Sequence, residues 1–106
     1  MIQDVCSDDA MTYEDAFHQI IPRVDRFKND LLTAMRQQKD GKKRARLIEL
    51  LAHSKDESLI EVFKQELESE EFDVISWSLF ALENNPSKDG TEIAEKFRQA
   101  NPKYSE

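Results

Sequence analysis

The densest group of ionisable side chains in this sequence is an acidic cluster between residues 66 and 73. It contains Glu66, Glu68, Glu70, Glu71 and Asp73. Carboxylates so close together could hold a metal ion, act as an acid and base pair, or bind a basic partner. Calcium-binding loops need a glycine at their sharp turn, and this stretch has none. Because the paired carboxylates of hydrolases face each other across a substrate, we expect no metal site and no catalytic residue here.

The histidines and the cysteine also lack the partners that chemistry would need. His18 and His53 lie far apart, and neither has a second ligand at the spacing of a zinc site. Cys6 is the only cysteine and lies among acids, whereas a reactive thiolate needs positive surroundings. The two glycines are too few for a phosphate-binding loop. We therefore expect a protein that is not an enzyme and that uses no cofactor.

The charges are unevenly distributed, with a formal net charge of −7. The basic residues gather in one run, which consists of Arg36, Lys39, Lys42, Lys43, Arg44 and Arg46. Proteins that grip nucleic acid usually carry a broad basic face, so the overall charge argues against that as the main function. The run could favour a helix C-terminus, pair with acids of a neighbouring repeat, or contact RNA or another anionic partner.

The chain lacks the signals of membrane insertion and secretion. No apolar stretch approaches the roughly 20 residues that span a bilayer. The N-terminus has neither the basic flank nor the continuous apolar run of a signal peptide, and a single cysteine suits a reducing compartment. We expect a cytoplasmic protein with a flexible leader over residues 1–10 and a single helical-repeat domain over residues 11–106.

Apolar residues recur at steps of three and four along most of the chain, which predicts amphipathic helices. The expected helices cover residues 12–20, 22–38, 42–53, 56–69, 72–84 and 90–100. Pro22 either separates the first two or kinks one continuous helix. Ser54, followed three residues later by Glu57, predicts a capping box at the start of helix 56–69. Helix 72–84 is apolar on most sides, which is typical of a central helix.

Two aromatic residues of helix 72–84 have a special position. A projection at 100° per residue places Phe72, Ile75, Leu79 and Leu82 on one face, and Val74, Ser78 and Ala81 on another. Trp77 and Phe80 fall between these faces, beside Asp73. They either fill the core or form the centre of a protein-binding surface with an acidic rim. The candidate partner-binding residues are Glu66, Glu70, Glu71, Asp73, Trp77 and Phe80. The acids could equally stabilise the positive end of a helix dipole.

The sequence contains a degenerate internal repeat. Ser54–Asp56 recurs as Ser87–Asp89, 33 residues later, and "SLIEVFKQ" matches "TEIAEKFRQ" with one insertion. Helix–turn–helix units of this period are typical of α-solenoids. Over residues 42–100 the chain resembles HEAT-type repeat proteins, with Asp73, Val74, Ser78 and Ala81-Leu82 at the pattern's positions but Ile75 where many repeats carry arginine. The resemblance implies an all-α fold, a short right-handed α-solenoid of five to six helices in antiparallel hairpins.

The functional expectation rests on this resemblance. Being small, acidic, HEAT-like and without a catalytic motif, the chain is similar to bacterial immunity proteins, the antitoxins that protect cells from a cognate toxin. The similarity implies a non-catalytic module that binds and neutralises a basic toxin domain, such as a nuclease. Two alternatives stay open. One is a scaffold or regulatory adaptor in a larger complex, and the other is a nucleic-acid-associated helical module.

Overall fold

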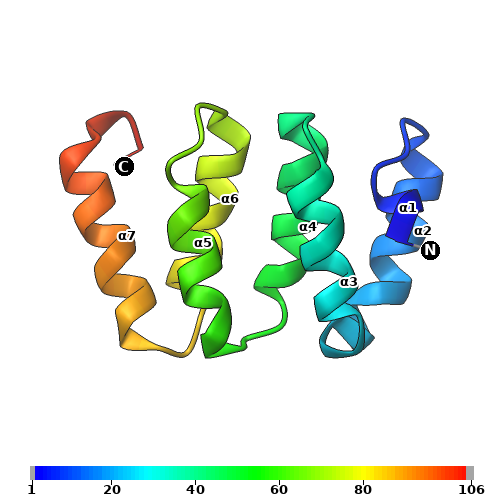
Figure 1. The fold of residues 1–106 in the computed structure, drawn as a ribbon, viewed down its shortest axis with the longest axis horizontal. Coiled ribbons are helices and arrows are strands. Elements are labelled where there is room, and N and C mark those ends of the chain that lie inside the picture. The colour runs from blue at the N-terminus through cyan, green and yellow to red at the C-terminus, as the bar shows by residue number, and fades with distance from the viewer. Residues whose placement is uncertain (1, 105–106) are drawn as a thin grey trace.

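The chain folds entirely into helices in the computed structural model, which describes residues 2–104, and these residues contain no strand. A one-turn helix, α1 (Ile2–Val5), is followed by six longer ones: α2 (Ala10–Ile20), α3 (Val24–Gln37), α4 (Gly41–Ala52), α5 (Ile60–Glu66), α6 (Phe72–Glu83) and α7 (Lys88–Ala100). Short 3-10 turns cover Ile21–Arg23, Glu57–Leu59 and Pro102–Tyr104. The helices stand side by side along the molecule's longest dimension of 37 Å (Figure 1).

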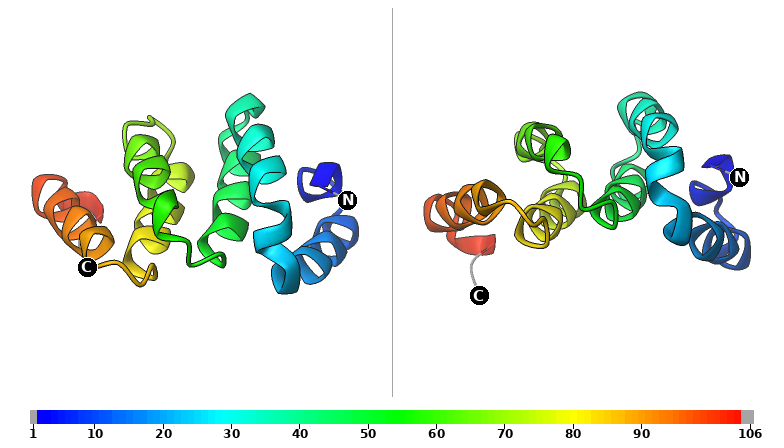
Figure 2. Two further views of the ribbon diagram at one scale, coloured as in Figure 1. Left: turned by 60° about the horizontal axis from the view of Figure 1, so that its bottom comes forward. Right: turned by 90° about the horizontal axis from the view of Figure 1, so that it is seen from below.

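Both consecutive and alternate helices pack on each other. Helix α3 packs on α4, α5 packs on α6, and the most extensive contact joins α4 to α6. Seen from below, α3 and α5 lie on one side of the row, and α4 and α6 lie on the other (Figure 2). Because α6 contacts α4, α5 and α7, it occupies the central position that its apolar composition predicts.

Both predicted apolar faces of α6 are buried, with one exception. Val74 and Leu82 have no exposed surface, and the hydroxyl of the buried Ser78 donates to the Val74 carbonyl oxygen at 2.7 Å. Phe72 was expected on a buried face but is 57% exposed. It is the first residue of α6, where only a C-terminal residue, Tyr104, stacks on it.

The helices begin at polar caps, although one predicted cap is wrong. The side chain of Asp40 accepts hydrogen bonds from the backbone N–H groups that open α4, and Ser87 does the same for α7. The predicted capping box of Ser54 and Glu57 does not form. Asp56 caps the 3-10 turn before α5 instead, because the Ser54 hydroxyl donates to Asp25 of α3 at 2.6 Å.

The two Ser-Lys-Asp segments are therefore not equivalent in structure, despite their matching letters. In the first, the aspartate is the cap and Lys55 has a φ of 60°, in the left-handed region. In the second, Ser87 is the cap. The first turn is instead tied to the end of α6, where Lys55 donates to the carbonyl oxygen of Asn84 and Asn85 donates to that of Asp56, each at 3.0 Å.

A close backbone contact fixes α7 against α6. Gly90 of α7 is buried, and a Cβ atom there would lie 2.4 Å from the carbonyl oxygen of Leu82. Any side chain at this position would force the helices apart. At the other end of the molecule, Pro22 lies in the 3-10 turn that separates α2 from α3, so the first two helices are distinct.

Candidate functional site

The acidic cluster begins with a residue that is already paired. Glu66, at the end of α5, accepts two hydrogen bonds from Arg44 of α4, at 2.6 Å from Nε and 2.8 Å from Nη2. The Glu66 side chain is only 11% exposed. This hydrogen bond is the main cause of the raised pKa of the Arg44 guanidinium. Glu66 therefore serves the contact between helices α4 and α5, and it is poorly placed to meet a partner.

The remaining acids divide between a groove and the open surface. Glu68 and Glu71 line a groove of about 480 Å³ between the α3–α4 turn and the α5–α6 turn. Arg36, Lys39 and Arg44 line the same groove, so it carries both signs of charge. Glu70 is exposed and makes no ion pair within residues 2–104.

Asp73, Trp77 and Phe80 lie together on the outer side of α6. Phe80 is 42% exposed and Trp77 is half-buried. Their rings meet edge to face, with centroids 5.3 Å apart and planes at 76°. Asp73 precedes Trp77 by one turn and is partly exposed. The structure thus brings these three predicted residues onto one face.

The strip of α6 beside this face carries Phe72, an aromatic residue that was predicted to be buried but is exposed. Phe72 and Phe80 are separated by two turns of α6, with the small Ser76 between them. The Phe72 ring stacks on that of Tyr104, with centroids 5.3 Å apart and planes at 19°. We call Phe72, Asp73, Ser76, Trp77 and Phe80 the aromatic face. The spacing of four between Phe72, Ser76 and Phe80 was the signal that could have revealed it.

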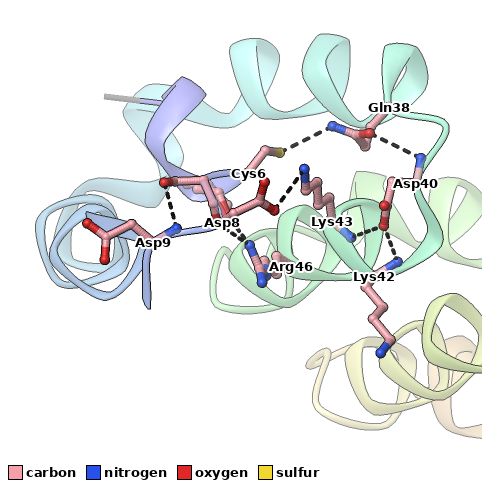
Figure 3. Close-up of polar contacts among 10 residues, drawn as sticks. Cys6, Asp8, Asp9, Gln38, Asp40, Lys42, Lys43 and Arg46 are labelled. Atoms are coloured by element: carbon pink, nitrogen blue, oxygen red, sulfur yellow. Dashed lines mark hydrogen bonds and ion pairs between the residues drawn. The ribbon is translucent and has the colours of Figure 1, made fainter. Parts of the chain in front are cut away.

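Half of the basic run makes contacts within the described residues, through Lys43, Arg44 and Arg46; Figure 3 shows those of Lys43 and Arg46. Arg44 pairs with Glu66, and Lys43 pairs with Asp8 at 3.2 Å. Arg44 therefore pairs with an acid of another helix, whereas the partner of Lys43 lies in the N-terminal segment. Arg46 instead lies over the ring of Tyr13, 4.2 Å from its centroid.

Arg46 also anchors the N-terminal segment, which we expected to be a flexible leader. Its Nη1 donates to the carbonyl oxygens of Val5 at 3.2 Å and Ser7 at 2.9 Å (Figure 3). Val5 has no exposed surface, and Cys6 accepts a hydrogen bond from Gln38 at 3.4 Å. Residues 2–8 thus pack onto α3 and α4 through contacts distant in sequence, and the flexibility of residues 1–10 stays a prediction.

Other groups that could do chemistry are dispersed. Within residues 2–104, no three His, Cys, Asp or Glu side chains are placed to share a metal ion. Glu49 of α4 has a raised pKa because its carboxyl group is partly desolvated, but no second titratable group is paired with it among the described residues. The described helices include none that is both long and apolar enough to cross a membrane.

Comparison with known proteins adds no relative. No protein-family model matches the chain, and neither the curated proteins nor the solved structures contain a match.

Proposed function

We propose that this chain is a non-catalytic protein-binding module, built as a short HEAT-like right-handed α-solenoid. The packing of α3 on α4 and of α5 on α6 supports two successive antiparallel hairpins, and the contact between α4 and α6 supports their stacking. In such a fold each hairpin covers its neighbour, and one layer of helices is left as an extended surface for partners.

The observation that carries the proposal is the aromatic face of α6. Among residues 2–104, the exposed large hydrophobic side chains are Met11, Phe72 and Phe80, and two of these three share that face. Aromatic side chains at the surface are costly to leave in water and dominate the binding energy of protein interfaces. Trp77 packs against Phe80 through their edge-to-face contact. This contact restricts the Phe80 ring before a partner binds.

The charge around this face supports a basic partner. Glu70 and Asp73 make no ion pair within the described residues, and the whole chain has a net charge of −7. An acidic surface attracts a basic partner from a distance, which gives fast association that salt weakens. The particular form we propose is an immunity protein that occludes a basic toxin domain, such as a nuclease.

The test is binding to the product of the neighbouring gene, which we expect to be a toxin, measured by calorimetry with the purified full-length chain. We expect one-to-one binding that weakens at high salt. Trp77→Ala and Phe80→Ala should each raise the Kd by about tenfold or more, the loss typical of a hot spot. Met11→Ala removes another exposed large hydrophobic side chain, in α2, and serves as the control, with no expected change.

Two results would contradict different parts of the proposal. If the chain does not bind the neighbouring toxin, the immunity role is wrong. If it binds but the α6 variants and Met11→Ala all retain full affinity, the aromatic face is not the binding surface. Charge reversal by Asp73→Lys separates the electrostatic contribution of the acidic rim from the apolar contribution of the aromatic rings. It should lower the association rate constant more than it raises the dissociation rate constant.

A further inference from the structure

A second apolar surface involves α7, the helix at the end of the row farthest from the N-terminus (Figure 1). A groove of about 570 Å³ runs between α5 and α7. Its apolar lining consists of Leu67, Ile93, Phe97 and Ala100. Leu67 is buried, Ile93 and Phe97 are half-buried, and Ala100 is exposed.

The groove is open because α7 packs less closely on α5 than on α6. Helix α7 packs mainly on α6 and makes a smaller contact with α5. Inside the row, α4 and α6 each contact helices on more than one side. Beyond α7 the described chain continues only into the short turn Pro102–Tyr104, and none of that turn's residues lines the groove.

The rim of the groove is electrically neutral, unlike the molecule as a whole. Two acids and two bases surround the apolar lining: Glu61, Lys64, Glu68 and Lys96. A chain with a net charge of −7 repels its own copies over most approaches. At this groove the balanced charges remove that repulsion, and each acid can face a base of an identical rim.

The apolar residues of α7 also suit a two-fold axis. Ile93, Phe97 and Ala100 follow one another at steps of four and three, so they form one stripe along the helix. If two α7 helices cross antiparallel with the axis near Phe97, each Ile93 lies opposite Ala100 of the second copy. A large side chain then faces a small one at both ends, which is the complementarity that an isologous interface requires.

We infer that a second copy of this chain occupies the α5–α7 groove and forms a two-fold symmetric dimer through α7. The dimer leaves the proposed partner-binding surface free, because none of the residues of the aromatic face lines the groove. Each dimer therefore presents two aromatic faces. The inference does not depend on the proposed function, since it rests on a different groove and a different charge pattern.

The experiment is sedimentation equilibrium of the full-length chain over micromolar concentrations. We expect a concentration-dependent shift to twice the monomer mass, with a Kd in the range of about 1–100 μM, as for a small interface. Lys96→Glu gives the rim an excess of acids in both copies and should raise the Kd by about tenfold or more. Adding Glu68→Lys restores the neutral rim and should recover most of the affinity.

The control is Lys88→Glu, which makes the same charge change at the exposed first residue of α7, outside the groove. A wild-type chain that stays monomeric throughout would overturn the inference, even if the groove then proved to hold a helix of another protein. Equal weakening by Lys88→Glu and Lys96→Glu would also overturn it. Circular dichroism of each variant verifies the fold, which these exposed substitutions should not change.

Discussion

Arg44 and Glu66 join the most basic and the most acidic segments of the chain through two hydrogen bonds, at 2.6 and 2.8 Å. Two runs of opposite charge that look like separate binding sites in the sequence are thus partly neutralised by each other. The pair also ties α4 to the end of α5, and both residues line the same groove as Glu68, Glu71 and Arg36. Because Glu66 is paired and largely buried, the residues that remain accessible to a partner are Asp73 and the rest of the aromatic face.

The Arg44–Glu66 pair should contribute measurably to stability. We expect a double-mutant cycle of Arg44→Met and Glu66→Gln to give a coupling energy of about 1–2 kcal/mol, because the pair is bidentate and partly desolvated. The Lys43–Asp8 pair is the control, since Asp8 is 93% exposed and should couple by less than about 0.5 kcal/mol. Urea unfolding measures both cycles. Similar coupling in the two cycles would contradict this interpretation of the Arg44–Glu66 contact.

The N-terminal segment should behave as part of the folded domain. Val5 has no exposed surface, so Val5→Ala should lower the free energy of unfolding by about 2 kcal/mol. Gln3→Ala, on the exposed side of the same turn, should change it by less than about 0.5 kcal/mol. Chemical denaturation of both variants provides the measurement. If Val5→Ala is as mild as Gln3→Ala, residues 2–8 act as a leader after all.

Asp56 should make stability depend on pH in the acid range. Its hydrogen bond from Lys28, helped by those from Ser58, lowers the pKa of its carboxyl group from 3.8 to about 2. Because the folded-state pKa is depressed, the stabilisation is present above the unfolded value and is lost as the pH falls toward the folded value. Asp56→Asn keeps a capping oxygen but removes the titration.

The expected result for Asp56→Asn is a stability difference from the wild type that is largest above about pH 4 and shrinks toward pH 2. Urea unfolding at a series of pH values across that window measures it. Subtracting the two curves cancels the titration of the other carboxylates. A difference that stays constant with pH would show that Asp56 has an ordinary pKa.

Gly90→Ala should change the stability of the protein in the direction opposite to that expected from helix propensity. Alanine favours a helix interior over glycine by about 1 kcal/mol, yet Gly90→Ala should destabilise the protein by about 1–3 kcal/mol, because the new Cβ would meet the Leu82 carbonyl oxygen. Thr91→Ala, exposed on the next position of α7, should instead be neutral or slightly stabilising. Thermal unfolding compares the two. Stabilisation by Gly90→Ala would show that α7 can move away from α6 at little cost.

The helices were predictable from the sequence because their causes are local. The predicted helices 42–53 and 72–84 lie within one residue of Gly41–Ala52 and Phe72–Glu83, since apolar periodicity defines them. Helix 56–69 was predicted too long, because its first turn is a 3-10 turn and α5 ends at Glu66. The wrong cap has a distant cause: the hydroxyl of Ser54 is bound by Asp25, which a local pattern does not reveal.

In the candidate site, too, features with a local cause were predictable and features with a tertiary cause were not. The placement of Asp73, Trp77 and Phe80 on one face was predictable, because a helical projection needs only the sequence of one helix. The pairing of Glu66 was not predictable, because its partner Arg44 lies in another helix. Phe72 was misassigned because a helical projection does not show that the first residue of α6 is left 57% exposed, with the ring of Tyr104 stacked on it. The part of the site that depends on tertiary contacts therefore required the structure.

The surface character of Phe80 can be tested against its neighbour in α6. Leu79 is 1% exposed and Phe80 is 42% exposed. Leu79→Ala should therefore cost about 2–5 kcal/mol of unfolding free energy, whereas Phe80→Ala should cost about 1 kcal/mol, mostly from the lost edge-to-face contact with Trp77. Because Trp77 is the only tryptophan, its fluorescence follows both unfolding transitions, and Phe80→Ala should also make it easier to quench. Equal losses for the two variants would place Phe80 in the core and remove the main support for α6 as the binding surface.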